Sequence, residues 1–252
     1  MLRYSISIFF FICITTTAWS QSPSKPIDLQ PKDTIKKTDP YGLRIGLDLS
    51  KIINSSIEED YQGIEFVGDY RINRDWYLAA ELGNEKYTQQ EDLYNYTTSG
   101  SYIKIGADYN TYENWYGMKN LIHIGGRYAV SSHSQTLNNY SIFNANRFFN
   151  PTNFDERSTI PEEFSGRSRG WIEAVVGMKV ELFANIFLNF SARIGVLLNT
   201  DDSNERFPDL WIPGFNKITD NSRFGANYNY SISYFIPLYK KVKKKKEEKS
   251  IN

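Results

Sequence analysis

The segment 170–199 contains two long stretches in which apolar and polar residues alternate, separated by Phe-Ala-Asn at 183–185. Successive side chains of a β-strand point to opposite faces, so each stretch presents one apolar face and one mixed face. The apolar residues are Ile172, Ala174, Val176, Met178, Val180 and Leu182, then Ile186, Leu188, Phe190, Ala192, Ile194, Val196 and Leu198. The pattern predicts a hairpin of long strands. By itself it does not decide whether the apolar face meets a protein core or lipid.

The same alternation recurs in six further segments, and helix signals are nearly absent. The segments are 41–52, 63–72, 76–83, 101–110, 120–130 and 223–239. Strands of roughly ten residues suit a tilted crossing of a bilayer. The predicted fold class is therefore all-β, a transmembrane antiparallel up-and-down β-barrel of about eight strands. A count of ten stays open, because an extra hairpin could form in one of the loops.

The connections between these strands alternate between short and long. Short connections are expected at 72–75, 111–119 and 183–185, and long ones at 53–62, 85–99, 134–169 and 199–222. Outer-membrane barrels place short turns at the periplasmic rim and long loops outside the cell. The spacing thus favours an outer-membrane barrel over a β-sandwich.

The mixed face carries charges of both signs on nearly every strand. We expect a lumen ion network made of Arg44, Asp48, Glu65, Asp69, Arg71, Glu81, Lys104, Asp108, Arg127, Glu173, Lys179, Glu181, Arg193 and Arg223. Eight strands enclose a lumen that side chains can fill, and buried charges need partners. Glycines on this face would make room for long Arg and Lys side chains. The prediction is a plugged lumen; a solvated sandwich surface is the alternative explanation for these charges.

The chain ends suggest export. Residues 1–20 have a basic start, an apolar core and a small-x-small ending, which predicts a cleaved signal peptide. Residues 21–40 form a polar, proline-containing linker, 41–239 the barrel, and 240–252 a lysine-rich tail that is either solvated or in contact with anionic lipid headgroups. The one cysteine, Cys13, lies in the signal segment, so the mature chain has no disulfide. With 29 basic and 29 acidic residues, net charge gives no reason to expect nucleic acid as a partner.

These features resemble small outer-membrane barrels of the OmpA/OmpX type. The stretches YGLRIGLDLSK, SYIKIGADYN, WIPGFNK and YSISYFIPLYKK also resemble an uncharacterised barrel-like family of Bacteroidota, domain of unknown function 6048. The resemblance implies localisation in the outer membrane, with membrane lipid and the barrel-assembly machinery as partners. It implies no chemistry. The strand signal SYFIPLY is followed by further charged residues, so the assembly machinery would have to read an internal signal.

Signals for chemistry are weak. We expect no enzyme activity, no cofactor and no metal site. His123 is predicted to face the lumen in mid-strand as a structural residue. His133, near several serines at the predicted extracellular end of a strand, is the one candidate base for a lipid-modifying or proteolytic activity.

Aromatic residues in the long loops suggest surface binding. The candidate binding residues are Tyr140, Phe143, Phe148, Phe149, Phe154, Trp211 and Phe215, and the expected ligand is an extracellular glycan, peptide or protein. Strand extension above the membrane is the competing interpretation of 138–164. The predicted role is structural or surface-binding. The alternatives are a soluble periplasmic lipocalin-like barrel that binds a small apolar ligand, and a narrow channel.

Overall fold

The computed structural model describes residues 38–112, 119–141, 160–198, 207–217 and 223–242. The chain divides into two units, 1–37 and 38–252. The first unit lies outside the described residues, as does the tail from 243 onward. The predicted signal peptide and most of the predicted linker therefore stay sequence-based predictions.

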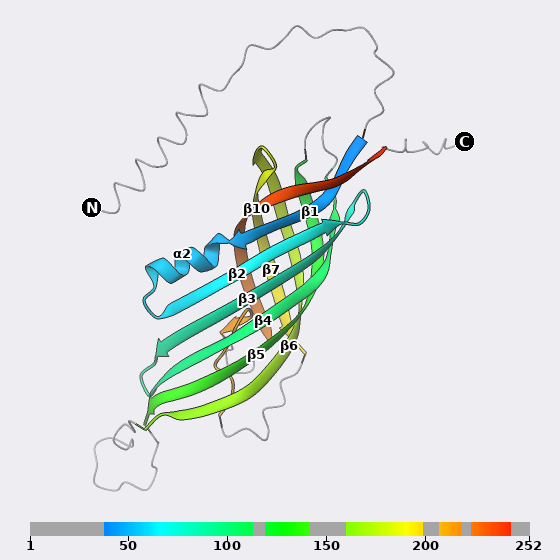
Figure 1. The fold of residues 1–252 in the computed structure, drawn as a ribbon. Helices are drawn as coiled ribbons and strands as arrows, with labels where there is room; N and C mark the ends of the chain where they lie inside the picture. The colour runs from blue at the N-terminus through cyan, green and yellow to red at the C-terminus, as the bar shows by residue number, and fades with distance from the viewer. Residues whose placement is uncertain (1–37, 113–118, 142–159, 199–206, 218–222, 243–252) are drawn as a thin grey trace, which may run out of the picture. The chain divides into compact units, whose positions relative to one another are not determined.

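Eight strands close into one antiparallel barrel in the order β1-β10-β7-β6-β5-β4-β3-β2 (Figure 1). The strands are β1 Thr38–Asp48, β2 Tyr61–Arg71, β3 Trp76–Gln90, β4 Tyr94–Asn110, β5 Leu121–Tyr140, β6 Glu162–Phe183, β7 Ile186–Leu197 and β10 Phe224–Val242. Two short strands, β8 Trp211–Ile212 and β9 Asn216–Lys217, pair only with each other. The all-β up-and-down fold and the count of eight are confirmed. The barrel strands start three residues before the predicted boundary at 41 and end three residues after 239.

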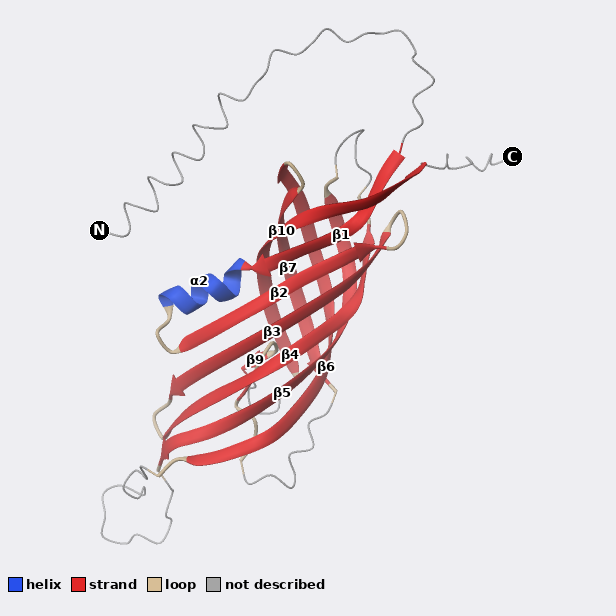
Figure 2. Cartoon of the chain, in the orientation of Figure 1, coloured by secondary structure: helices blue, strands red, loops and turns tan. Residues whose placement is uncertain are grey.

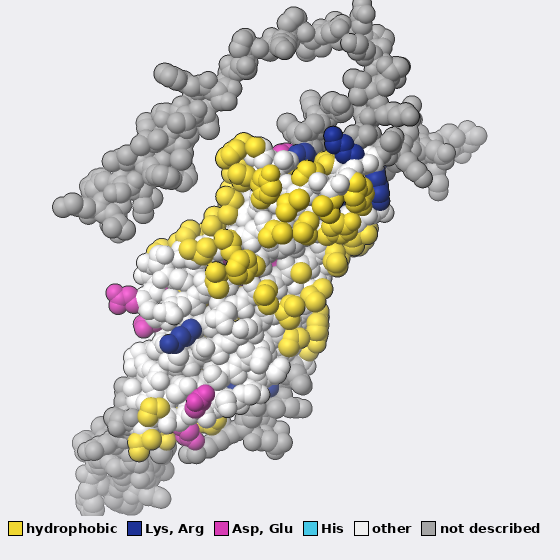
Figure 3. Space-filling view, in the orientation of Figure 1, with side chains coloured by type: hydrophobic (Ala, Val, Ile, Leu, Met, Phe, Trp, Pro, Cys, Tyr) yellow, Lys and Arg dark blue, Asp and Glu magenta, His cyan; other side chains and the backbone are white. Residues whose placement is uncertain are grey.

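Burial follows the predicted faces, with charges inside and apolar side chains outside. On β6, Ile172 and Val176 are about half exposed, whereas Glu173 and Val175 are buried. Figure 3 shows apolar side chains gathered over the half of the visible face nearest the described strand ends at Thr38 and Val242. From Ile172 to Leu182, β6 rises about 33 Å along the strand, or about 25 Å after a tilt of about 40°. That height matches the apolar band of membrane barrels.

Several strands continue well beyond this apolar band. A long loop was expected at 85–99, but β3 continues to Gln90 and β4 begins at Tyr94, so this prediction was wrong. Likewise β5 reaches Tyr140 and β6 begins at Glu162, so both ends of the loop expected at 134–169 belong to strands. The outward side chains of these extensions are polar, so the sequence lacks the apolar contrast that identifies a strand in lipid. These extensions of β3, β4, β5 and β6 form a polar surface at the loop end of the barrel, which we call the polar collar.

A helix interrupts the segment where the first strand was expected to continue. Helix α2 spans Leu49–Ile57, so the predicted strand to Ile52 and the loop at 53–62 were both partly wrong (Figure 2). Asp48 ends β1 and caps the helix, since its Oδ1 accepts a hydrogen bond of 2.7 Å from the amide of Ser50. The spacing of Leu49, Ile52 and Ile53 fits one face of a helix, whereas Leu49 alone continues the alternation of β1.

The turn between β6 and β7 shows how the short rim is built. Ala184 and Asn185 both have positive φ angles, 44° and 69°. Positive φ at both central residues is the signature of a type I′ turn, whose twist matches that of the flanking strands. Asn tolerates this region, but Ala carries a steric cost of about 1–2 kcal/mol there.

Replacing Ala184 by Gly should relieve this cost. We expect Ala184→Gly to raise the free energy of unfolding by roughly 0.5–1 kcal/mol, because part of the gain is offset by the greater freedom of Gly in the unfolded chain. Urea titration of the refolded barrel measures the change. Ala192→Gly, at an outward strand position, is the matched control and should be destabilising. Equal effects of both substitutions would contradict the strain at Ala184.

Candidate functional site

The lumen contains a continuous chain of ion pairs. It starts with Arg44 and Asp69, neighbours on β1 and β2 whose Nη2 and Oδ1 atoms lie 2.7 Å apart. Asp69 also lies 2.7 Å from the Nζ of Lys179 on β6. Lys179 reaches Asp108 at 3.5 Å, and Asp108 pairs with Arg127 at 2.7 Å. All five side chains are buried.

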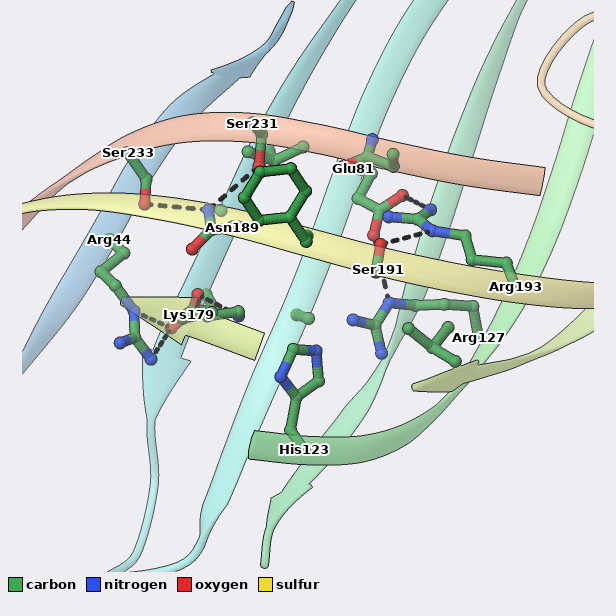
Figure 4. A pocket seen from close by; sticks show the side chains of 17 residues that line it. Arg44, Glu81, His123, Arg127, Lys179, Asn189, Ser191, Arg193, Ser231 and Ser233 are labelled. Carbon is green, nitrogen blue, oxygen red and sulfur yellow. Dashed lines mark hydrogen bonds and ion pairs between the residues drawn. The ribbon is translucent and has the colours of Figure 1, made fainter. Parts of the chain in front are cut away.

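The chain of ion pairs continues toward the loop end. Arg127 lies 3.3 Å from Glu81, and Glu81 lies 2.5 Å from Arg193 (Figure 4). Arg193 approaches Glu173 at 3.7 Å, and Glu173 pairs with Lys104 at 3.1 Å. We call these nine residues, from Arg44 to Lys104, the lumen network.

Two of these pairs cross the whole barrel. In the ring of eight strands β2 lies opposite β6, and β3 lies opposite β7. The Asp69–Lys179 and Glu81–Arg193 pairs therefore join opposite walls. A cavity of about 40 Å³ remains beside them. Buried charges of opposite sign thus occupy the cross-section of the barrel.

The remaining residues of the predicted network lie elsewhere. Asp48 caps α2 and accepts a hydrogen bond of 2.5 Å from Asn229, and Glu65 accepts one from the hydroxyl of Tyr102. Both are buried, and neither makes an ion pair within 4.0 Å in the part of the chain that is described. Nearer the rims, Arg71 lies 3.7 Å from Asp39, and Glu181 pairs with Lys119 at 3.0 Å. Arg223 precedes β10 with an exposed side chain, so its predicted place in the lumen was wrong.

Residues 207–217 enter the barrel from the loop end and form a plug. Ile212 is fully buried and Phe215 is 2% exposed. The Phe215 ring packs edge-on against Trp171, with ring centroids 5.5 Å apart. It also lies where a Cβ at Gly195 or Gly225 would be, 2.9 Å away in each case. These two glycines thus make room for an aromatic ring of the plug, and not for the Arg or Lys side chains expected from the sequence.

The candidate binding residues in the loops are placed differently from the prediction. Trp211 and Phe215 were expected to be exposed, but both are buried in the plug, so that prediction was wrong for them. Tyr140 is half-buried against the aromatic cluster around Tyr61 and Tyr96. The remaining four, Phe143, Phe148, Phe149 and Phe154, lie outside the described residues.

One carboxylate anchors the plug to the barrel wall. Asp209 lies 3.1 Å from the Nε2 of His133, 2.5 Å from Arg167 and 2.5 Å from Arg169. Burial alone would raise the pKa of Asp209, but hydrogen bonds from His133 and Arg167 lower it to about 2. Next to this anchor, Gln135 accepts a hydrogen bond of 2.9 Å from the amide of Leu210. The anchor could not be inferred from the sequence, because Asp209 lies far along the chain from His133, Arg167 and Arg169.

The two histidines both face inward. His123 lies in the lumen, 3.8 Å from Asp108, with its ring beside Gly177. His133 is buried at the plug anchor, in the loop-end half of β5. Within the described ranges, no group of three or more His, Cys, Asp or Glu side chains is arranged to hold a metal ion.

Comparisons with known proteins place the chain in a family. A family model for a domain of unknown function (DUF6048) matches residues 1–241, which confirms the resemblance seen in the sequence. No curated protein matches the sequence. A solved structure similar to this chain is Ail, the attachment invasion locus protein of Yersinia pestis, with 8% identity, a TM-score of 0.37, and coverage of 80% of this chain and 99% of that one. In the described part of the chain, no helix has the length and hydropathy to cross a membrane.

The lumen network predicts a strong effect from removing one member of a crossing pair. Arg193→Met should lower the free energy of unfolding by roughly 3–5 kcal/mol, because Glu81 is left facing a low-dielectric interior with less compensation. The double variant Glu81→Leu/Arg193→Met should recover most of this loss. Denaturant unfolding in liposomes measures both. Additive losses in the double variant would contradict coupling across the lumen.

The plug anchor predicts a pH-dependent contribution to stability. The folded pKa of Asp209, about 2, is below its ordinary value of about 3.9. Its contribution, on the order of 2 kcal/mol, is therefore present above about pH 4 and is lost as the pH falls toward 2. The wild type should be more stable than Asp209→Asn at pH 6, and the difference should vanish near pH 2. A difference independent of pH would contradict the anchor.

Proposed function

The chain belongs to the DUF6048 family, and we propose that it is an outer-membrane β-barrel with a closed lumen, which serves as a rigid scaffold for a binding surface at its loop end. The observation that carries this proposal is the separation of faces. Paired charges lie inside the barrel, and apolar side chains lie outside it in one band. An apolar band about 25 Å high is what a bilayer requires of a membrane barrel.

The orientation of the apolar face argues against a soluble lipocalin-like barrel. Such a barrel would enclose Ile172, Val176 and Ile194 to form an apolar cavity. Instead these side chains point outward, and Val176 and Ile194 are 56% and 61% exposed. The inside carries charge, which does not suit a small apolar ligand. Lipid contact accounts for the exposed side chains without a second protein.

The filled cross-section argues against a channel. The crossing pairs Asp69–Lys179 and Glu81–Arg193 span the lumen, and the plug lies between them and the loop end. An ion would have to separate buried pairs and displace Phe215 to pass. A closed, rigid wall instead supports a structural or surface-binding role, in which the polar collar and α2 present side chains outside the membrane.

The placement of His133 supports an anchoring role over a catalytic one. Its Nε2 is engaged with Asp209 at 3.1 Å, and the side chain is buried under the plug. We expect His133→Ala to loosen the plug, measured as faster amide exchange at residues 209–215, without the loss of any lipid-modifying or proteolytic activity. Loss of such an activity with an unchanged plug would support the catalytic alternative.

Cell fractionation tests the membrane assignment. We expect the protein in the outer-membrane fraction, with an electrophoretic mobility that changes on boiling, because the closed barrel resists detergent until it is heated. Recovery in the soluble periplasm without such a change would contradict the proposal.

A charge placed in the apolar band gives a sharper test. Val176→Arg puts a guanidinium on the lipid face and should cost roughly 2–4 kcal/mol near the middle of the bilayer. Asn84→Arg, also outward but on the polar collar, is the matched control and should cost little. The measurement is unfolding of both variants in liposomes. Equal costs would mean that the two positions share one environment.

A further inference from the structure

The barrel wall has a gap at its loop end, next to α2. β1 ends at Asp48, but its neighbours continue: β10 pairs only with β7 from Phe224 to Tyr230, and β2 starts at Tyr61 before its pairing with β1 begins. Helix α2 packs against both β2 and β10 at this place. A half-open pocket of about 290 Å³ lies here, lined by residues of α2, β2, β3, β10 and the plug. We call it the mouth pocket.

Part of the lining of the mouth pocket is aromatic. It is formed by Tyr61 at the start of β2, Tyr87 on β3 and Trp211 of the plug. The rings pack on one another, with centroids 6.1 Å apart for Tyr61 and Tyr87 and 5.4 Å apart for Tyr87 and Trp211. Tyr61 and Trp211 are buried, and they support the half-buried Tyr87. A ligand would therefore meet mainly the ring of Tyr87.

The lining also carries four half-buried side-chain amides, those of Asn54 on α2, Gln89 on β3, Asn216 of the plug and Asn227 on β10. The Gln89 amide is already bonded to Glu91 and Tyr96. The Nδ2 of Asn216 donates to the Oδ1 of Asn227. That bond leaves Asn216 Oδ1 as an acceptor and Asn227 Nδ2 as a donor. Each of these groups can bind a hydroxyl group of a ligand.

The charges at the pocket floor cancel each other. Lys51 Nζ lies 2.5 Å from Glu85 Oε1. Burial alone would lower the pKa of Lys51, but the Glu85 carboxylate raises it, so the pair stays ionised. The lysine still has further N–H groups to donate. An anionic ligand therefore finds no uncompensated cation at Lys51, and the other charged residue of the lining, Glu58, is a solvent-exposed carboxylate. A neutral ligand with hydroxyl groups can accept a hydrogen bond from Lys51.

We propose that the mouth pocket binds a neutral saccharide, as one sugar ring or a disaccharide. A sugar ring has an apolar C–H face, which suits the ring of Tyr87, and hydroxyl groups, which suit the side-chain amides of the lining. The volume is at the small end of ligand pockets, which enclose about 300–1,000 Å³ and combine apolar walls with a few placed polar groups. The inference rests on the proposed function, since the loop end then faces the cell exterior and meets glycans there.

Titration of the refolded barrel with free sugars tests the assignment. The detergent must be a sugar-free amine oxide, because glycoside detergents would occupy the site. The probes are the methyl glycosides of glucose, galactose, mannose and N-acetylglucosamine, with inorganic phosphate and acetate as charged comparisons. Saturation-transfer NMR detects binding, and calorimetry measures Kd.

Two substitutions remove one side of the pocket each. Asn54→Ala removes an amide and favours the helix, while Tyr87→Leu removes an aromatic ring. Each should weaken binding about tenfold. Asn84→Ala is the matched control, because Asn84 lies on the same strand as Tyr87 but points out of the barrel. It should leave Kd unchanged.

The possible outcomes separate this inference from the proposed function. Binding of at least one neutral sugar, weakened by both pocket variants and not by the control, supports the saccharide site. Absence of sugar binding, binding of phosphate or acetate alone, or equal Kd values in all variants would overturn it. Heat-dependent mobility is recorded on the same preparations, so a folded barrel that binds no sugar overturns the saccharide site and leaves the membrane barrel intact.

Discussion

The ion pairs across the lumen are the constraint on which the other features depend. A charge inside an eight-strand barrel is costly unless a partner lies within a few ångströms. The Asp69–Lys179 and Glu81–Arg193 pairs meet this condition by joining opposite walls, which requires a narrow barrel. Strand alternation then places every second residue on the outside. The strand alternation that places charges inside the barrel therefore also places apolar residues outside it.

The plug and the lumen network occupy different parts of the same barrel. The network lies level with the apolar band, whereas the Asp209 anchor lies level with the polar collar, where the outward neighbours Ser132 and Ser168 are exposed. Lys104 connects the two closures, because it pairs with Glu173 and also donates to the carbonyl of Gly214 at 3.0 Å. Movement of the plug would therefore also disturb the Lys104–Glu173 pair of the lumen network.

The sequence allowed the barrel and its two faces to be predicted because period-two alternation is a local signal. Residues such as Glu81 and Arg127 could be placed inside from their neighbours alone. Their actual partners could not, since Glu81 and Arg193 are 112 positions apart. Helix α2 was missed although Asp48 is a good N-cap residue, because Leu49 continues the alternation of the preceding strand. On the collar, polar residues on both faces concealed the continuation of β3 and β4.

The plug shows a different limit of sequence reasoning. Trp211 and Phe215 were predicted to be exposed because they lie in a loop rich in turn residues. Their burial depends on space left at Gly195 and Gly225, on strands far away along the chain. Further glycine–aromatic contacts of this kind lie at the plug and around it, including those of Gly83 and Gly214 with Tyr102. From the sequence, this burial could have been suggested only by matching inward-facing glycines of the strands with aromatic residues of a loop.

The proposed closure of the lumen depends on the paired charges and the plug together. Ion conductance of the purified barrel in a planar bilayer tests this closure, with insertion confirmed on the same sample by its heat-dependent mobility. We expect no steady current through the inserted wild-type protein at any voltage the bilayer withstands. A stable open current of uniform size per inserted barrel would contradict it.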